Sequence, residues 1–427
     1  MNVITLTIWQ GSIYLIPLIT TPYLARVLGV QEFGWLGLAG AVVSYISLVV
    51  DWGFSLSATQ KVAQNSGQVH VLRQLFWDVV LAKFILVCVM AAIFLLFILF
   101  FPDLKKILPI VLAFLLQVIF GVLNASWLLQ GLERMMSFAL ASLAGRVLTI
   151  PLTFVFVHGP DDVVVAAAIQ GGSFSISAIA SLWAAGQVLD LRPVTFSPAR
   201  SCQQIRDGAS LFLSTGGISL YSQGNVLVLG AISGATAAGL YSGADRVRRA
   251  VQGVTGPVST ALFPRVNNLV VTNPLRAKTL IGLILLVQGG GTFFLSLGQY
   301  FAADFVVTRF LGPAFVDAVP VVQALAPIPF LVGLSNVFGM QMLIPLGFSR
   351  SFTIITLGAG FCSLIFLPIL CFFHGAVGAA VAATVTEGLV TTMMALVLFV
   401  RRKTLFAKPE PVPEPAAEIL APLLLER

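Results

Sequence analysis

Charged residues are scarce in this chain of 427 residues, at 10% of the composition, whereas soluble domains carry about 25%. Hydrophobic residues make up 58%, and the mean hydropathy is +0.98. The shortage of charge excludes an ordinary soluble domain. The composition instead predicts an integral membrane protein, in which each crossing needs about 20 apolar residues.

Cysteine and histidine are also rare, with 4 and 3 residues. The cysteines are widely scattered and form neither a CxxC pair nor a ligand cluster, so packing in the core is the simplest role for Cys88, Cys202, Cys362 and Cys371. The histidines are far apart as well, and no P-loop spacing occurs. We therefore expect no cofactor, no metal and no nucleotide site.

Apolar segments recur along almost the whole chain. Twelve are long enough to cross a membrane: 4–25, 35–55, 79–101, 107–130, 138–157, 164–188, 209–231, 238–262, 280–301, 318–346, 352–373 and 376–400. In lipid every backbone group must be satisfied within the segment, and the period-two alternation of barrel strands is absent, so the fold class is an all-α polytopic membrane protein. The first segment has no basic leader or cleavage site and is expected to remain as a helix.

Lysine and arginine predict the orientation, because cytoplasmic loops hold an excess of them. With the N-terminus inside, the even loops and the tail carry Lys61, Arg73, Arg134, Arg192, Arg200, Arg206, Arg276, Lys278, Arg350, Arg401, Arg402 and Lys403, and the odd loops carry only Arg26, Lys105, Lys106 and Arg309. Both termini are therefore expected in the cytoplasm. This topology explains the net charge of +7 without a nucleic-acid partner, and a basic face suits anionic membrane lipids.

The two halves of the chain share a pattern. An apolar helix ends in Leu-Gly at residues 28–29 and again at 229–230, a turn with Gly34 or Gly239 follows, and a second helix ends in a basic patch. Chance similarity between apolar helices is the alternative explanation. We expect two parallel six-helix lobes, 1–200 and 201–400, around a central cavity, followed by a disordered Pro- and Glu-rich cytoplasmic tail at 401–427.

Four stretches within this pattern resemble a known family. They are PYLARVLGVQEFG (22–34), DWGFSLSATQKVA (51–63), WLLQGLERM (127–135) and the run 212–266, which contains FLSTGGISLYSQGNVLVLG and GLYSGADRVRRAV. The chain resembles, as far as about residue 400, the polysaccharide biosynthesis (O-antigen, Wzx-type) flippases of the MOP exporter superfamily, which also includes MATE drug exporters and lipid II flippases.

The resemblance implies a function. Such proteins are thought to move an undecaprenyl-diphosphate-linked oligosaccharide across the cytoplasmic membrane by alternating access of a cationic central cavity. A polysaccharide polymerase and a chain-length regulator are the partners that the resemblance suggests, and the lipid-linked oligosaccharide is the expected substrate.

Charges within the expected membrane segments are mostly cationic: Lys83, Arg146, Arg246, Arg248 and Arg249. Such charges usually face a bundle interior or a wet cavity, and arginine can bind phosphate oxygens with both arms of its guanidinium. We therefore take these five as candidate substrate-binding residues. Arg246 and Arg249 share a helix face, while Arg248 points elsewhere.

Several of these residues also have an ordinary explanation. Asp245 and Arg249, spaced i and i+4, could neutralise each other, or the whole arginine cluster could lie at the membrane interface. Lys83 lies one turn inside the membrane and could extend to the head groups.

Asp51 and Glu387 are candidate gating or coupling residues. Asp51 could pair with a cation of the other half, or simply cap the break after its helix. Glu387, near the middle of the last segment, could couple transport to a proton or cation, or could be protonated and hydrogen-bonded to a nearby threonine.

Three other functions compete with the flippase hypothesis. A MATE-type drug exporter would present acidic residues to cationic drugs, whereas this interior is richer in arginine and lysine. A membrane glycan polymerase or ligase would carry a large outer loop with catalytic histidine or arginine, and the outer loops here are short. A scaffold without transport would leave the buried charges without a use.

Overall fold

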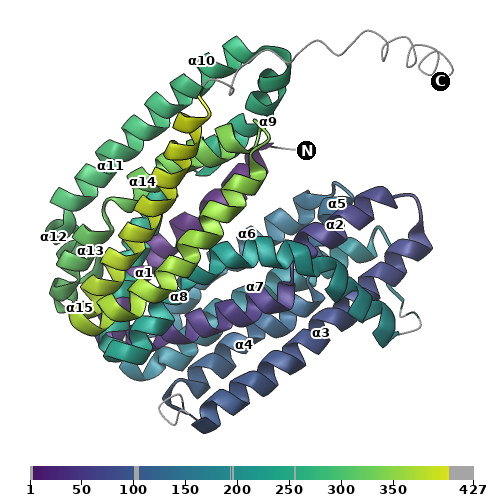
Figure 1. Ribbon diagram of the computed structural model, residues 1–427. Helices are drawn as coiled ribbons and strands as arrows, with labels where there is room; N and C mark the ends of the chain where they lie inside the picture. Colours follow the sequence, from purple (N-terminus) through teal and green to yellow (C-terminus); the bar gives the residue numbers. More distant parts are fainter. Residues whose placement is uncertain (1–2, 101–104, 193, 195–196, 254–255, 403–427) are drawn as a thin grey trace.

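The computed structural model describes residues 3–100, 105–192, 194, 197–253 and 256–402, and within these residues the chain is helical, with no strand (Figure 1). The expected disordered tail lies almost entirely outside the described residues. Helices in the first part of the chain are α1 (Val3–Asp51), α2 (Phe54–Gln64), α3 (Val69–Phe100), α4 (Leu108–Leu123), α5 (Ser126–Gly131), α6 (Met135–Phe156), the short η2 (Pro160–Asp162) and α7 (Val163–Gly186).

The second part begins with the longest helix and contains several short elements. They are α8 (Pro198–Gln252), α9 (Gly256–Thr272), α10 (Pro274–Ile284), η3 (Leu285–Gly289), α11 (Gly290–Phe301), α12 (Ala303–Val306), η4 (Val307–Leu311), η5 (Pro313–Ala318), α13 (Val319–Leu325), α14 (Ile328–Asn336), η6 (Val337–Leu343) and α15 (Ser349–Val400). Three of the short elements, η3, η4 and η6, are π-helical turns that continue a neighbouring α-helix.

Nine helical segments of the described chain are long and apolar enough to cross a membrane. Large apolar side chains stay exposed along them, such as Phe294 at 70% and Phe372 at 73%, as expected for a surface that faces lipid. Three helices contain a single residue with non-helical backbone angles, namely Gly29 in α1, Gly234 in α8 and Gly375 in α15. The multi-pass fold is thus confirmed, while the count of twelve spans stays a prediction.

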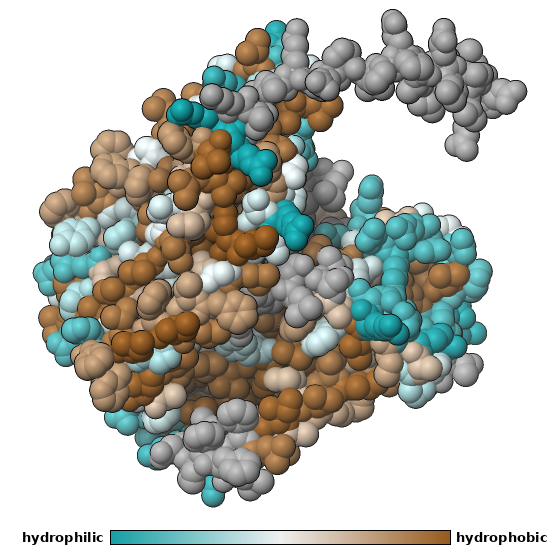
Figure 2. Space-filling model, in the orientation of Figure 1, coloured by the Kyte–Doolittle hydropathy of each residue, from teal (hydrophilic) through white to brown (hydrophobic). Residues whose placement is uncertain are grey.

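Two groups of helices diverge from a common junction in Figure 1, one formed by α2 to α7 and the other by α9 to α15. Helices α1 and α8 make the most extensive contact in the molecule and hold the groups together at the junction. Hydrophilic residues gather at the end that carries α2 and α5, while the flanks of the molecule are largely hydrophobic (Figure 2). The polar end therefore suits contact with water.

Helices α1 and α8 cross at two glycines that approach each other reciprocally. A Cβ on Gly34 would lie 3.0 Å from the main-chain nitrogen of Gly239 and closer still to the carbonyl oxygen of Ala235. A Cβ on Gly239 would lie 3.2 Å from the Cα of Gly34 and closer still to the carbonyl oxygen of Val30. We call these four residues the glycine crossing. Each glycine follows its own helix break, Gly29 or Gly234, by the same number of residues.

This symmetry corrects one detail of the sequence comparison. Gly34 and Gly239 are equivalent, as expected, but the turn equivalent to Gly29 is at Gly234 and not at Gly230. Both turn glycines have positive φ, +72° and +82°, which a residue with a side chain rarely adopts. Gly230 instead lies within the helix, against the side chain of Leu38.

Two other expectations need correction. Within the eighth expected span, 238–262, α8 ends at Gln252, and the next described helix, α9, begins at Gly256. All four cysteines were expected to pack in the core, but only one of them is fully buried. Cys371 is fully buried, whereas Cys88 and Cys202 are exposed and Cys362 is intermediate.

Candidate functional site

The second half of α8 carries the densest group of charges in the membrane region. The buried carboxylate of Asp245 accepts hydrogen bonds from Nε of Arg248 and Nε of Arg249, each at 2.7 Å. The neutralising pair that the i, i+4 spacing allowed is therefore formed, and Arg248 joins it. Two guanidinium groups on one carboxylate leave this part of α8 with an excess of positive charge.

Arg246 points in another direction and reaches α1. Its Nη1 donates to Oγ1 of Thr21 at 3.1 Å, and its guanidinium carbon lies 4.8 Å from the centre of the Phe33 ring. Thr21 and Phe33 are 1% and 0% exposed, and Phe33 packs edge-on against Phe315. In the described part of the chain Arg246 forms no ion pair. Arg246 and Arg249 were expected to point to the same side of the helix, but Arg246 contacts α1 whereas Arg249 binds Asp245.

Glu387 on α15 lies near this group. Arg248 is close enough to Glu387 for an electrostatic interaction, although the described residues show no ion pair between them. Thr391 Oγ1 donates to the main-chain carbonyl of Glu387 at 2.8 Å, so that threonine does not bind the carboxyl group. The structure therefore brings Asp245, Arg248 and Glu387, from α8 and α15, into one neighbourhood.

Arg146 is separate from the α8 group. It lies on α6, with its guanidinium carbon 5.8 Å from the centre of the Phe174 ring on α7, and it forms no ion pair among the described residues. A cation over an aromatic ring gains about 0.5–1 kcal/mol at an exposed site and about 2 kcal/mol or more when it is desolvated, so the ring can stabilise Arg146 without neutralising it. No contact connects Arg146 directly to Arg246.

Lys83 and Asp51 form an ion pair within the first half. Lys83 Nζ lies 3.2 Å from Oδ1 of Asp51, and the two side chains are 5% and 45% exposed. Lys83 therefore does not extend to the head groups. Asp51 pairs with a cation of its own half and not, as the gating hypothesis supposed, with one from the other half.

The sequence did not single out the contacts between α2 and the beginning of α8. Lys61 Nζ lies 2.6 Å from both Asp207 Oδ2 and Gln204 Oε1. Trp52, between α1 and α2, donates its indole N–H to the carbonyl oxygen of Ile205 at 2.7 Å. The Trp52 ring also stacks on Phe212 with 4.1 Å between centroids. In the sequence, Lys61 served only as evidence for the orientation in the membrane, because its partner Asp207 is far away along the chain.

Two more ion pairs belong to the same region. Arg73 pairs with Asp190 at 2.7 Å and Arg200 pairs with Asp78 at 3.3 Å. We call these two pairs and Lys61–Asp207 the ion-pair cluster. Outside the membrane-spanning segments, the hydrogen bond from Lys61 holds the pKa of the Asp207 carboxyl below its usual range.

The arrangement is suited to binding an anion and offers no evident catalytic chemistry. In the described residues, no group of three His, Cys, Asp or Glu side chains could hold a metal ion. The candidate substrate-binding residues are three cations on α8, one on α6 and one on α3, and the structure brings only those on α8 together.

Comparison with known proteins gives consistent matches along the chain. The family described as "Polysaccharide biosynthesis protein" matches residues 1–270. A protein of Escherichia coli (strain K12) named "Putative O-antigen transporter" is 35% identical over 95% of this chain and 97% of its own length. A protein of Shigella dysenteriae with the same name is 25% identical over 92% of this chain and 98% of its own.

Two solved structures share the fold. The lipid II flippase MurJ, in an inward closed conformation, has a TM-score of 0.71 with 13% identity, over 99% of this chain and 96% of its own. An inward-facing multidrug resistance MATE family transporter of the MOP superfamily has a TM-score of 0.70 with 15% identity, over 91% of this chain and 95% of its own. The solved structures share the fold, whereas the family match and the curated relatives, which are named transporters and not enzymes, place this multi-pass membrane protein in the polysaccharide biosynthesis protein family.

Proposed function

We propose that this protein is a flippase that moves an undecaprenyl-diphosphate-linked oligosaccharide, the repeat unit of an O-antigen or exopolysaccharide, across the cytoplasmic (inner) membrane by alternating access. The single observation that carries the proposal is Arg246, a cation in the membrane region that contacts Thr21 and Phe33 and no carboxylate. The names of the two curated relatives support the same cargo class.

Arg246 lies where the two groups of helices meet. It extends from α8 to both segments of α1, because Thr21 precedes the Gly29 break and Phe33 follows it. A diphosphate needs cations where water is scarce, and a guanidinium can bind two of its oxygens at once. A phosphate bound there would replace the weak contact with Thr21 and would act on both helices of the junction.

Four further cations have graded roles in this proposal. Arg248 and Arg249 share the carboxylate of Asp245, so they supply a positive field and partial contacts. Arg146 remains without an acidic partner in the described chain and is a second phosphate or acidic-sugar contact. Lys83 is already paired with Asp51 and contributes least to substrate binding.

Two carboxylates are proposed to couple or gate the cycle. Glu387 competes with Asp245 for Arg248, so that protonation of Glu387, or binding of a cation, would change how firmly Arg248 holds Asp245. Asp51 would release Lys83 when the polar end closes. The lipid-linked product would then be used by a polymerase and a chain-length regulator on the other side, and both termini of this chain would lie in the cytoplasm.

A MATE-type drug exporter is the second candidate, since the two solved neighbours have nearly equal TM-scores. The fold does not decide the cargo. The sign of the charge favours an anionic cargo, because α8 carries three arginines here but one buried carboxylate, which pairs with two of them.

Reconstitution tests the proposal. Purified protein in sealed liposomes should move an undecaprenyl-diphosphate-linked oligosaccharide to the opposite leaflet, detected with an impermeant sugar-modifying reagent. Arg246→Gln, Arg249→Ala and Arg146→Ala should each impair movement, whereas Arg192→Gln, an 85% exposed residue, should not. Unchanged activity in all three variants would remove the cationic-cavity hypothesis. Export of cationic dyes without sugar movement would favour the drug exporter.

A further inference from the structure

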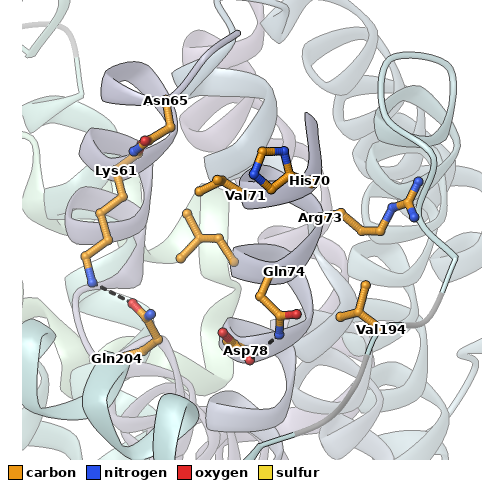
Figure 3. A pocket seen from close by; sticks show the side chains of 10 residues that line it. Lys61, Asn65, His70, Val71, Arg73, Gln74, Asp78, Val194 and Gln204 are labelled. Atoms are coloured by element: carbon orange, nitrogen blue, oxygen red, sulfur yellow. Dashed lines mark hydrogen bonds between the residues drawn. The ribbon is translucent and has the colours of Figure 1, made fainter. Parts of the chain in front are cut away.

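A cavity of about 760 Å³ lies between α2, α3 and the start of α8, away from the arginines of the junction. Lys61, His70, Arg73 and Asp78 are the ionisable residues of its lining, and Asn65, Gln74 and Gln204 add amide groups. In Figure 3, Lys61 of α2 and Asn65, the residue after α2, lie across from His70 and Gln74 of α3. Its volume is within the range of small-molecule sites.

The surroundings of the cavity have two features that are typical of the membrane–water interface. Two tryptophans nearby donate their indole N–H to backbone carbonyls, Trp52 to Ile205 and Trp77 to Leu191. Tryptophan is enriched at this level of the membrane because its ring is amphipathic. The hydrophilic surface around α2 and α5 marks the same end of the molecule (Figure 2).

The basic residues of the lining keep hydrogen-bond donors available. Lys61 has three N–H donors and Arg73 has five. In the described chain Lys61 makes two hydrogen bonds, to Gln204 and Asp207, and Arg73 makes two, both to Asp190. The exposed His70 has no hydrogen bond in the same residues.

The acidic residues offset the charge of Lys61 and Arg73 but do not use all of their N–H donors. Asp207 and Asp190 pair with Lys61 and Arg73 but do not line the cavity. Asp78 does line it, but it is 4% exposed and its oxygens accept from Gln74 and Arg200. The lining therefore combines hydrogen-bond donors with the apolar side chains of Val71, Leu75 and Val194.

We propose that this cavity binds a phosphate group, supplied by the head group of an anionic phospholipid such as phosphatidylglycerol, through Lys61, His70 and Arg73. Basic pockets between helices at the membrane surface are suited to such head groups. The apolar side chains would contact the glycerol and ester region. Because the lining comes from α2, α3 and α8, the bound lipid would strengthen the attachment of α8 to the first half. The site does not depend on the proposed flippase activity.

The test is ligand-dependent thermal stability and binding of the purified full chain in detergent. Soluble dioctanoyl phosphatidylglycerol should raise the midpoint of unfolding, whereas dioctanoyl phosphatidylcholine should have a much smaller effect. His70→Asn with Arg73→Gln should weaken phosphatidylglycerol binding by about tenfold or more, as expected for losing hydrogen bonds to a charged group. Arg192→Gln is the matched control, because Arg192 also pairs with Asp190, at 3.7 Å, but does not line the cavity.

His70→Asn alone keeps the test valid if loss of Arg73 disturbs folding, since His70 makes no hydrogen bond among the described residues. Inorganic phosphate forms the second arm. If inorganic phosphate stabilises the wild type but not the His70 and Arg73 variants, the site binds phosphate and its ligand is a soluble phosphate. If only the lipid stabilises the protein, the ligand is the lipid head group. Equal lipid binding by wild type and both variants, or equal binding of the two lipids, would overturn the proposal.

Discussion

Helix α8 meets the first part of the chain in two places, and the two contacts are built in different ways. At the glycine crossing, Gly34 and Gly239 allow two backbones to approach without side chains between them. At the ion-pair cluster, long charged side chains connect α2 and α3 to the start of α8 and to Asp190, which lies between α7 and α8.

The difference follows from the solvent at each place. Between helices in lipid there is little hydrophobic driving force, so association depends on close packing of small residues. Near water, exposed ion pairs form readily but each contributes only about 0–1 kcal/mol. The crossing should therefore be intolerant of small changes, whereas the ion-pair cluster should lose stability in small steps.

The largest effect is expected from Gly34→Ala and Gly239→Ala. Each new Cβ would collide with backbone atoms of the other helix, which cannot rotate away as a side chain can. Overpacking of this kind costs about 1–3 kcal/mol, so the midpoint of thermal unfolding in detergent should fall and transport should be impaired. Because the two glycines share one contact, the double variant should be less harmful than the sum.

Gly358→Ala on α15 is the matched control, because a Cβ there meets nothing within 4 Å. An alanine in a helix is favoured over glycine by about 0.5–1 kcal/mol, so this variant should be as stable as wild type or more stable. Wild-type stability and transport in both crossing variants would show that the close approach is not required.

Trp52→Phe should have a smaller effect, at the boundary between the two regions. Phenylalanine can keep the stacking on Phe212 but loses the hydrogen bond to the Ile205 carbonyl. The expected loss is about 0.5–1.5 kcal/mol, measured by unfolding in denaturant or heat. A loss no greater than that of a surface substitution would mean that stacking alone maintains this contact.

The ion pair between Lys61 and Asp207 should contribute less to the free energy of unfolding than the Trp52 hydrogen bond does. Both side chains are about one third exposed, at 31% and 34%. A double-mutant cycle with Lys61→Gln and Asp207→Asn should give a coupling of about 0.2–1 kcal/mol that decreases at high salt. A salt-independent coupling of several kcal/mol would contradict the proposed difference between the two contacts.

The pH dependence of Asp207 is the smallest effect. The hydrogen bond from Lys61 lowers the pKa of the Asp207 carboxyl in the folded state. The carboxylate therefore stabilises the folded protein at pH values above its pKa in the unfolded chain, about 3.9, and this stabilisation is lost as the pH falls through the lowered pKa. Thermal unfolding measured from about pH 6 down to about pH 3 should show a decline that is weaker in Asp207→Asn. The same decline in both proteins would assign it to other carboxylates.

The sequence predicted the elements of this fold better than their connections. Hydropathy identified apolar helices, but the expected break between the first two spans is a single non-helical residue, Gly29, within α1. In the second half, the turn equivalent to Gly29 was expected at Gly230, four residues before its actual position at Gly234. A glycine can be helical or form a turn according to its neighbours, and Gly230 is helical, with Leu38 occupying the space that a side chain there would need.

The sequence by itself determined that the chain is a multi-pass helical membrane protein with an excess of cations in its apolar segments. That much depends on local transfer free energies and on residue identity, which need no knowledge of the fold. Only the tertiary structure decided which charges are compensated: Lys83 by Asp51, Arg248 and Arg249 by Asp245, and Arg246 by no carboxylate in the described chain. Partner choice depends on the rotation and crossing of helices, which are set by contacts between residues far apart in the sequence.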